Sequence, residues 1–451
     1  MERLAIARAF LGLILIGTGS AQTRLSLDAV VESAVQHPSI EIVRSRSEAA
    51  AAAIRVARTA FLPQVNALAQ MNRATTNNVY GMLLPQQVIA PISGPPVLEN
   101  RATNVFGSAI GALVSWDAFN FGLRRAQVAS EETAKRRADS AVDVRRFELG
   151  ATAADTFLTV LAAEQQERAA HAAVERSEVF LQSVTALARA GLRPGAEEAR
   201  SRAERAASDV RWIQVKQAVA VARAALGEFT ATPDAPLEAS RMLSGLPQGA
   251  VQAEAVHPAL QEQRLAIEES QARAKVIDRS VLPKVTLLGT TYARGTGAHP
   301  DLTTGGAASG ILPTFVNWGL GASVTWNLTG YRVASEKKRV EAAQEQGERA
   351  RLATIQRELD TSRKKALAAF EGSLQIAATM PQQLEAARST EQQATARYRS
   401  GLGTISDVAE AQQLLTRSEI DDALAKLGTW RALLNVAVAD GDLASFIKAV
   451  K

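Results

Sequence analysis

The chain has 451 residues, with 51 Lys and Arg against 46 Asp and Glu, so its formal net charge is only +5. That small excess is spread along the chain, and no basic block suits nucleic-acid binding. The absence of cysteine excludes disulfides, thiol catalysis and thiolate metal sites. Aromatic residues make up 5% and alanine is abundant, which favours long helices over a thick globular core.

Residues 1–21 have the pattern of a secretory signal peptide. Two arginines precede an apolar core at 9–17, and a small-residue cleavage site ends at Ala21. That core is shorter than the ~20 residues needed to cross a bilayer, so we expect cleavage rather than a membrane anchor. No later apolar run reaches spanning length. We therefore do not expect a helical membrane protein, whereas barrel strands would show only weak alternation.

Four landmarks recur along the chain at two consistent offsets. Two X-Pro steps recur after 220 residues (257 − 37 = 220), and a tryptophan and a Gly-Leu step recur after 210 (326 − 116 = 210). This regularity indicates a tandem duplication of one unit. The pairs are His37-Pro38 with His257-Pro258, Leu62-Pro63 with Leu282-Pro283, Trp116 with Trp326, and Gly191-Leu192 with Gly401-Leu402.

Each repeat is predicted to have the same elements: a helix, two strands around a loop, a very long helix, a glycine turn and a return helix. A helix of roughly seventy residues would be about 105 Å long. The first repeat is 22–229, with strands at 64–73 and 105–117 and its hairpin tip near 191. The second is 257–440, with strands at 284–294 and 318–328 and its tip near 401. Segment 230–256 links the repeats, and 441–451 forms a C-terminal tail.

The strand predictions rest on a two-residue period. In 318–328, apolar residues occupy every second position from Trp318 to Leu328, and small or polar residues occupy the others. Trp318 and Trp326 bracket an apolar band roughly 20 Å tall, close to the lipid-facing band of membrane sheets. We therefore assign Trp116, Trp318 and Trp326 to a membrane girdle. A half-buried sheet in a soluble domain is the alternative.

Pro63 and Pro283 are predicted to mark the passage from helix to membrane sheet, because proline cannot continue a helix and favours an extended residue before it. Backbone groups in lipid must all be paired, so four strands with two open edges cannot close alone. Chains must share strands: two chains give eight, three give twelve and four give sixteen. Eight strands enclose a lumen that side chains fill, so a conducting pore needs twelve or more.

Further motifs are SWDAFNFGLRRAQV (115–128), TWNLTGYRVASEKK (325–338), RAGLRPGAEEAR (189–200) and RYRSGLGTISDVAEAQ (397–412). With the twin Leu-Pro steps, they make the chain similar to the TolC-like outer-membrane efflux proteins over essentially its whole mature length. The resemblance implies a mainly α fold with a membrane β-barrel: a homotrimer pools four strands per chain into twelve, on a long α-helical periplasmic tunnel. One departure is Pro381, which we expect to interrupt the second long helix.

The resemblance also implies a passive exit channel in the cell outer membrane that extends into the periplasm. Its partners would be outer-membrane lipid, a periplasmic adaptor and an inner-membrane transporter, in a tripartite efflux pump or a type I secretion system. We expect no enzyme activity, cofactor or metal, because no histidine pair has metal-ligand spacing and no phosphate loop or nucleophile elbow is present. The alternative function is a periplasmic coiled-coil adaptor or structural rod, with negligible strand content. The cargo stays open.

By the same resemblance, the hairpin tips form the narrow periplasmic end of the tunnel, with an iris-like gate, and segment 230–256 and the C-terminal tail form a mixed equatorial region near the middle of the tunnel. Asp407 has a second explanation, because Thr404 to Asp407 reads as a capping box, and Glu197 lies in a first helical turn behind Pro194. The gating and capping roles can coexist. The expected adaptor-docking positions are Gly191, Leu192, Gly401 and Leu402, and the expected gate-lining residues are Glu197, Tyr398, Asp407 and Glu410.

The long helices begin with basic residues, which form either an ordinary solvated surface or a positive collar near the inner surface of the membrane. These residues are Arg124, Arg125, Lys337, Lys338 and Arg339.

Overall fold

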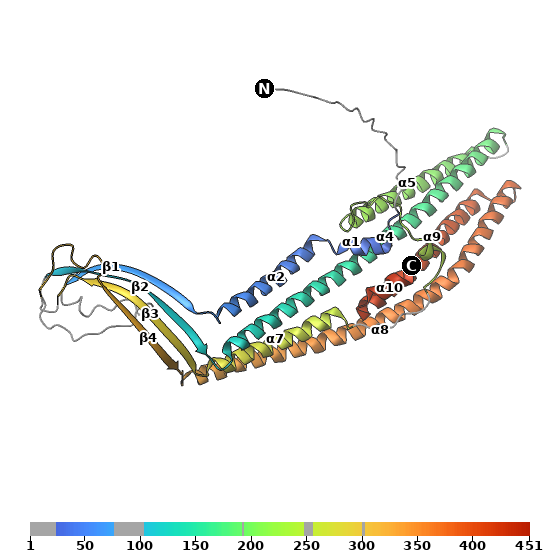
Figure 1. Cartoon of the computed structure of the whole chain (residues 1–451). Coiled ribbons are helices and arrows are strands. Elements are labelled where there is room, and N and C mark those ends of the chain that lie inside the picture. Colours follow the sequence, from blue (N-terminus) through green and yellow to red (C-terminus); the bar gives the residue numbers. More distant parts are fainter. Residues whose placement is uncertain (1–23, 76–102, 192–193, 248–255, 300–302) are drawn as a thin grey trace, which may run out of the picture. The chain divides into compact units, whose positions relative to one another are not determined.

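The structure is a computed structural model, and it describes residues 24–75, 103–191, 194–247, 256–299 and 303–451 (Figure 1). The predicted signal peptide and most of the loop between the first two strands lie outside these residues. The chain divides into two compact units, and each unit takes segments from both sequence repeats. Unit 1 is Met1–Pro38, Arg146–His257 and Leu359–Lys451, and unit 2 is Ser39–Arg145 and Pro258–Glu358.

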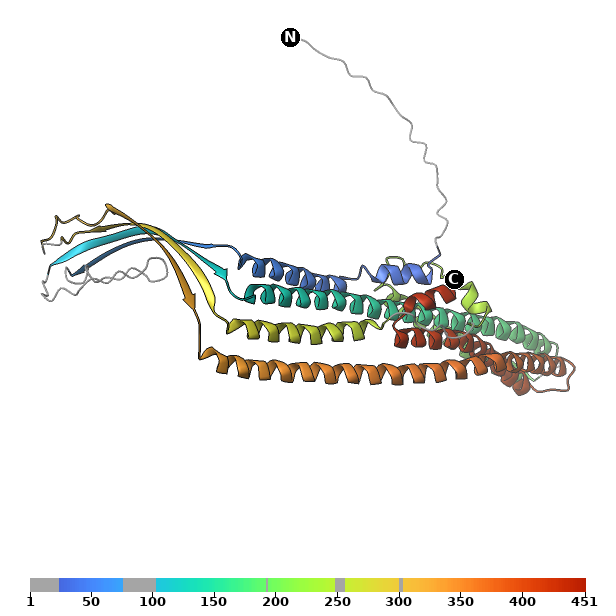
Figure 2. The ribbon, with the colours of Figure 1, turned by 60° about the horizontal axis from the view of Figure 1, so that its bottom comes forward.

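Unit 2 contains an antiparallel sheet whose strands follow the order β1-β2-β3-β4. Each strand joins a helix at the same end of the sheet, so four helical segments lie side by side in the order of the strands (Figures 1 and 2). The elements are α2 (Pro38–Thr59), β1 (Gln64–Thr75), β2 (Asn104–Phe119), the start of α4 (Leu123–Arg189), α7 (Pro258–Ser280), β3 (Lys284–Thr296), β4 (Phe315–Thr325) and the start of α8 (Gly330–Arg399). This strand content contradicts the alternative of a plain helical rod.

The Leu-Pro steps stand directly before two of the strands. The Leu62 N–H donates to the Thr59 carbonyl at 2.9 Å and completes the last turn of α2. Pro63 then has no N–H with which to extend the helix, and β1 begins at the next residue. Leu282 and Pro283 repeat this arrangement between α7 and β3.

Strand β4 begins three residues before the expected range (318 − 315 = 3) and ends at Thr325. Its end is explained by Asn327, whose side-chain oxygen and carbonyl both accept from the Gly330 N–H, at 3.0 and 3.2 Å. An Asn side chain that bonds its own neighbouring backbone in this way favours a turn over an extended strand. Trp326 therefore lies just beyond the strand.

Pro381 does not interrupt the second long helix, which corrects our expectation. It lies inside the continuous helix α8. A proline removes one donor from the helical ladder, but helical stability in proteins comes mostly from packing. Ala377 and Ala387, on either side of the proline, are both buried. That packing holds the helix across the missing hydrogen bond.

The sheet has two chemically different faces, because directly paired residues share a face. Val114 pairs with Val65 and Gly289, and Gly289 pairs with Leu320. The face that they share is apolar yet exposed, and Leu320 is 81% accessible. Its members include Ala67, Ala69 and Met71 of β1, Ile110, Ala112 and Trp116 of β2, Val285 and Leu287 of β3, and Val316, Trp318 and Val324 of β4.

The opposite face is polar around a small apolar patch. Leu68, Leu113 and Tyr292 pack against the buried Ala109. Polar side chains surround this patch: Asn66, Gln70 and Asn72 of β1, Thr286, Thr290 and Arg294 of β3, and Asn317 and Ser323 of β4. A sheet that covers a soluble core buries its apolar face and exposes its polar face. In this chain the apolar face is exposed instead.

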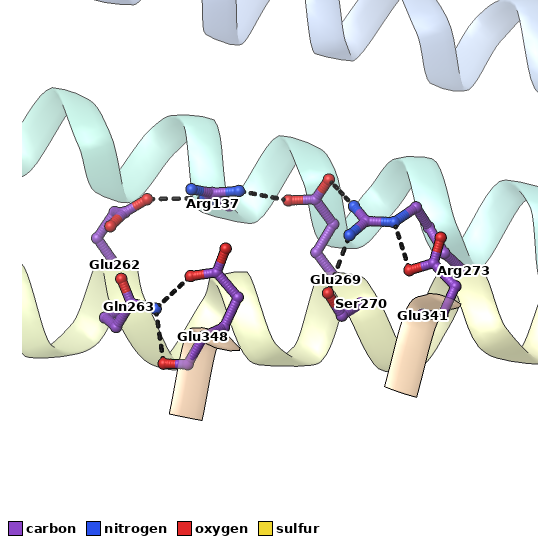
Figure 3. Close-up of polar contacts among 8 residues, drawn as sticks. All are labelled: Arg137, Glu262, Gln263, Glu269, Ser270, Arg273, Glu341 and Glu348. Carbon is purple, nitrogen blue, oxygen red and sulfur yellow. Dashed lines mark hydrogen bonds and ion pairs between the residues drawn. The ribbon is translucent and has the colours of Figure 1, made fainter. Parts of the chain in front are cut away.

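An ion-pair network joins three helices of unit 2 (Figure 3). Arg137 of α4 donates to Glu262 and Glu269 of α7, at 2.7 and 3.1 Å. Arg273 of α7 donates to Glu269 at 2.6 Å and to Glu341 of α8 at 3.1 Å. Burial lowers the pKa of the Arg137 guanidinium, but its two carboxylate partners raise that pKa by more. The network therefore stays charged and fixes the order α4-α7-α8.

Unit 1 is built of helices in the described residues. They are α1 (Leu27–Ala34), the remainder of α4, α5 (Gly195–Leu226), α6 (Ser240–Ser244), the remainder of α8, α9 (Ile405–Asp440) and α10 (Leu443–Val450). Helices α4 and α5 form one hairpin, and α8 and α9 form a second. Trp430 of α9 is buried in the core, and its indole donates to the Gly245 carbonyl at 3.1 Å. The linker and the C-terminal tail therefore pack around α9 through α6 and α10.

Candidate functional site

The two hairpins of unit 1 turn at glycines with a left-handed backbone. Gly191 follows α4 with φ +70°, and Gly401 follows α8 with φ +80°. The Leu402 N–H donates to the Arg397 carbonyl at 2.9 Å and the Gly401 N–H to the Tyr398 carbonyl at 3.1 Å, which is a Schellman motif. An apolar residue at the position of Leu402 often packs on the helix in such a motif, yet Leu402 is 74% exposed. Leu192 lies outside the described residues.

Tyr398 is the aromatic anchor of this end of unit 1. It comes from the last turn of α8 and is only 1% exposed. Its ring lies 5.3 Å from the ring of Phe180 on α4. Val184 of α4 and Ile405 and Val408 of α9 complete a buried cluster around it. Three helices therefore fix the position of this phenol.

The Tyr398 hydroxyl donates to the Glu197 carboxylate at 2.7 Å. Glu197 lies in the first turn of α5, so this bond joins the two hairpins near their tips. Pro194, at the N-cap of α5, makes no side-chain capping bond, whereas the Glu197 N–H donates to the Pro194 carbonyl at 3.1 Å. The Glu197 side chain therefore reaches across to the other hairpin rather than back to its own N-cap.

Asp407 caps its own helix. The Thr404 N–H donates to the Asp407 carboxylate at 2.9 Å, and the Asp407 N–H donates to the Thr404 hydroxyl at 3.3 Å, so the capping box is present. These bonds lower the pKa of the Asp407 carboxyl, and the charge of Arg397 adds to the effect. Asp407 is nonetheless exposed at the surface of the unit. It is therefore a fixed carboxylate that can still meet solvent ions.

Glu410 lies one turn after Asp407 on α9 and is also exposed. Residues three apart share a helix face, so the two carboxylates form one acidic patch. Glu410 forms no hydrogen bond or ion pair with another residue in the described part of the chain. The four residues expected at the gate thus separate into a hydrogen-bonded pair, the buried Tyr398 with the half-buried Glu197, and an exposed pair, Asp407 with Glu410.

The sequence did not single out the residues of α4 that hold Tyr398. Phe180, Val184 and Leu187 all pack in its cluster. Their i, i+4, i+7 spacing is a signal that could have identified them as one buried helix face. Their contact with a residue more than 200 positions later could not be read from spacing alone.

The three tryptophans of the expected girdle lie in unit 2. Trp116 and Trp318 are on the apolar face of the sheet, and Trp318 is among its most exposed members. The Trp116 indole donates to the Phe61 carbonyl at 3.0 Å, which ties it to the chain just before β1. Trp326 follows β4 and is also exposed. An indole with its ring in an apolar layer and its N–H bonded is typical of a membrane surface.

The described residues contain neither a metal-binding cluster nor a membrane-spanning helix. No group of three or more His, Cys, Asp or Glu side chains is arranged there to hold a metal ion. In the same described segments, no helix has both the length and the apolar composition to cross a bilayer.

Comparison with known proteins gives a family match and several structural relatives. The family model described as outer membrane efflux protein matches residues 29–232 and 250–442. No curated protein matches the sequence. The fold is similar to the outer-membrane channel OprN, with 18% identity, a TM-score of 0.70, and coverage of 92% of this chain and 89% of that one.

Two further structures share the fold across nearly the whole chain. The Campylobacter jejuni CmeC outer membrane channel has 14% identity and a TM-score of 0.70, with 92% of this chain and 85% of that chain covered. The outer membrane protein VceC of Vibrio cholerae has 16% identity and a TM-score of 0.68, with 92% and 96% covered. At these identities the likeness is one of fold.

Proposed function

The chain belongs to the outer membrane efflux protein family, and on that premise we propose that it is the passive exit channel of a tripartite efflux pump or a type I secretion system. An inner-membrane transporter would supply the energy, and a periplasmic adaptor would connect it to this chain. The choice between small molecules and proteins as cargo depends on that transporter, because a passive channel adds little selectivity.

The observation that carries this proposal is the exposed apolar face of the sheet. Both of its edge strands, β1 and β4, lack a second partner within the described part of the chain. In lipid an open edge leaves backbone groups unpaired, so copies of the chain must complete the sheet. Three copies would close twelve strands around the polar face and leave the apolar face toward lipid. We therefore propose a homotrimer.

We place the gate and the adaptor-docking tips at the end of unit 1 where the hairpins turn. The bond between Tyr398 and Glu197 would hold the hairpins together in the closed state. Threefold symmetry would repeat Asp407 and Glu410 as rings of carboxylates, which attract cations and repel anions. The exposed Leu402 beside Gly401, together with Gly191 and Leu192, would present the surface to which the adaptor binds.

Planar-bilayer recordings of the full-length protein test the gate. The double variant Asp407→Ala/Glu410→Ala should raise single-channel conductance or weaken block by divalent cations, because the carboxylate rings are gone. Glu371→Ala/Glu385→Ala removes two exposed carboxylates of α8 and is the matched control. Identical currents in wild type and gate variant would remove the gate assignment. A wild-type protein that forms no channels would refute the proposed function itself.

A further inference from the structure

A large groove lies in unit 2 where the sheet meets the helices. It encloses about 1190 Å³ between the end of β2, the start of α4 and the end of α7. One of its walls is aromatic and the other carries cations. It lies far along the chain from the residues of the proposed gate, and the proposed channel function gives it no role.

The aromatic wall continues the apolar face of the sheet. Trp116 and Phe119 lie on that face, paired with Leu287 and Val285 of β3. Phe121 follows, with its ring 4.7 Å from the ring of Phe119 in an edge-to-face arrangement. Trp116, Phe119 and Phe121 all line the groove and remain substantially exposed. The groove therefore opens on the side of the sheet that we assign to lipid.

Four cations line the other wall: Arg124, Arg125, Lys275 and Arg279. None of them forms an ion pair with a carboxylate in the described part of the chain. The one carboxylate in the lining belongs to Asp278, and it pairs with Lys338 at 2.7 Å. The wall consequently carries positive charge without a compensating anion, at the positive end of the α4 dipole.

Arg124 is the cation of this groove whose position is fixed by its contacts. Its guanidinium donates to the carbonyls of Ala60 and Ala118, at 3.1 and 3.3 Å, and lies 4.8 Å above the ring of Phe61. The residue is 8% exposed, and its buried Nε has no hydrogen-bond partner within the described residues. The two carbonyl bonds and the Phe61 ring hold the guanidinium in place, so Arg124 contributes a fixed positive charge to the groove wall.

We propose that this groove binds the phosphate headgroup of an anionic phospholipid from the periplasmic leaflet of the outer membrane. The inference rests on the proposed channel function, because it takes the apolar face as the lipid-facing one. The four cations match the negative charge of the phosphate, while the aromatic wall holds the glycerol and the first acyl carbons. A free anion would satisfy the cations but would leave the aromatic wall in water.

Native mass spectrometry of the delipidated full-length protein in non-ionic detergent tests the site. The probes are dioleoyl phosphatidylglycerol, dioleoyl phosphatidylcholine and inorganic phosphate. Wild type should retain phosphatidylglycerol in preference to phosphatidylcholine. Arg125→Gln/Lys275→Gln should weaken that retention roughly tenfold, because each cation near a membrane surface adds to the attraction of anionic lipid. Both side chains are exposed, so the variant should fold.

Arg332→Gln/Lys337→Gln removes the same charge from exposed positions at the start of α8, outside the groove, and should retain phosphatidylglycerol as wild type does. Equal losses in both variants, or no loss in either, would overturn the proposal. Displacement of the lipid by an equal concentration of inorganic phosphate would show a simple anion site and would overturn it too. Conductance measured in parallel separates the outcomes, because a conducting protein without lipid preference refutes the lipid site alone.

Discussion

Glu197 and Asp407 occupy equivalent positions in the two repeats (407 − 197 = 210), yet their carboxylates have different partners. Asp407 bonds the N-cap Thr404, whereas the N-cap before Glu197 is a proline that offers neither a hydroxyl nor an N–H. Glu197 is consequently available to accept from Tyr398. The duplication therefore produced one acid that caps a helix and one that ties two hairpins together.

Gly401 should resist substitution because of its backbone. Its φ of +80° is a conformation that a Cβ disfavours, and nothing crowds the position otherwise. We expect Gly401→Ala to destabilise the detergent-solubilised protein by about 1 kcal/mol, since the left-handed conformation costs an L-residue roughly that amount. Thermal unfolding followed by circular dichroism measures the change.

Gly372 provides the opposite case, within the helix that ends just before Gly401. It lies inside α8 with open space where a Cβ would stand. Gly372→Ala should raise stability by about 0.5–1 kcal/mol, because alanine loses less backbone entropy in a helix. The explanation by backbone conformation fails if both alanine variants shift the melting temperature in the same direction.

The elements could be predicted to different degrees from the sequence. The long helices α4 and α8 follow from continuous helical composition between a basic start and a glycine, and both helices have the expected length. The end of β4 could not be placed, because alternation continues through Trp326 while the Asn327 turn decides where the strand stops. The expectation for Pro381 was wrong for a related reason. The packing on both sides of the proline stabilises the helix by more than the proline destabilises it.

In the candidate site, too, contacts between residues close in the sequence could be predicted, whereas contacts between distant residues could not. The capping box at Thr404 and Asp407 is a local pattern, and the structure contains it. The bond between Tyr398 and Glu197 joins residues about 200 positions apart, and its geometry depends on three packed helices. No periodicity encodes such a contact, so only the fold reveals it.

Just before α7, His257 should make stability depend on pH. Burial lowers the pKa of its imidazole from 6.5, although a hydrogen bond to the Val438 backbone and the charge of Asp440 oppose this. Asp440 itself pairs with Arg363 at 2.6 Å, and Phe147 lies against the imidazole ring. The unfolded chain therefore binds the proton more readily, and native stability is lost as the pH falls below 6.5.

Replacing His257 by Asn keeps a polar side chain but removes the titration. The melting temperature of wild type should fall between pH 7 and pH 5 more steeply than that of His257→Asn, as thermal scans across this range would measure. His171→Asn, an exposed position on α4, should retain the wild-type slope. A steep slope that persists in His257→Asn would assign the pH dependence to other groups.

At the scale of the whole molecule, ion pairs join helices in both units, such as Arg137 with Glu262 in unit 2 and Arg176 with Glu419 in unit 1. Unit 1 adds the buried aromatic residues Trp430 and Tyr398. Only unit 2 has a sheet among the described residues, and that sheet exposes its apolar face. The arrangement is stable only if something apolar covers this face, which the family membership identifies as the outer membrane.

Two neighbouring positions of β4 test which face meets lipid. Leu320 belongs to the apolar face, whereas Gly321 belongs to the opposite face and has open space where a Cβ would stand. In a membrane sheet, Leu320→Arg should cost about 2–4 kcal/mol near the bilayer midplane. Gly321→Arg should be tolerated, because the new side chain enters the polar interior.

The amount of heat-resistant folded protein in the outer-membrane fraction, resolved by electrophoresis without boiling, measures both variants. We expect a strong loss for Leu320→Arg and a near wild-type amount for Gly321→Arg. Because Leu320 is already exposed in the single chain, an arginine there would be harmless if water covered that face. Equal amounts of the two variants would therefore contradict the lipid-facing assignment, on which the shared barrel and the phospholipid groove both depend.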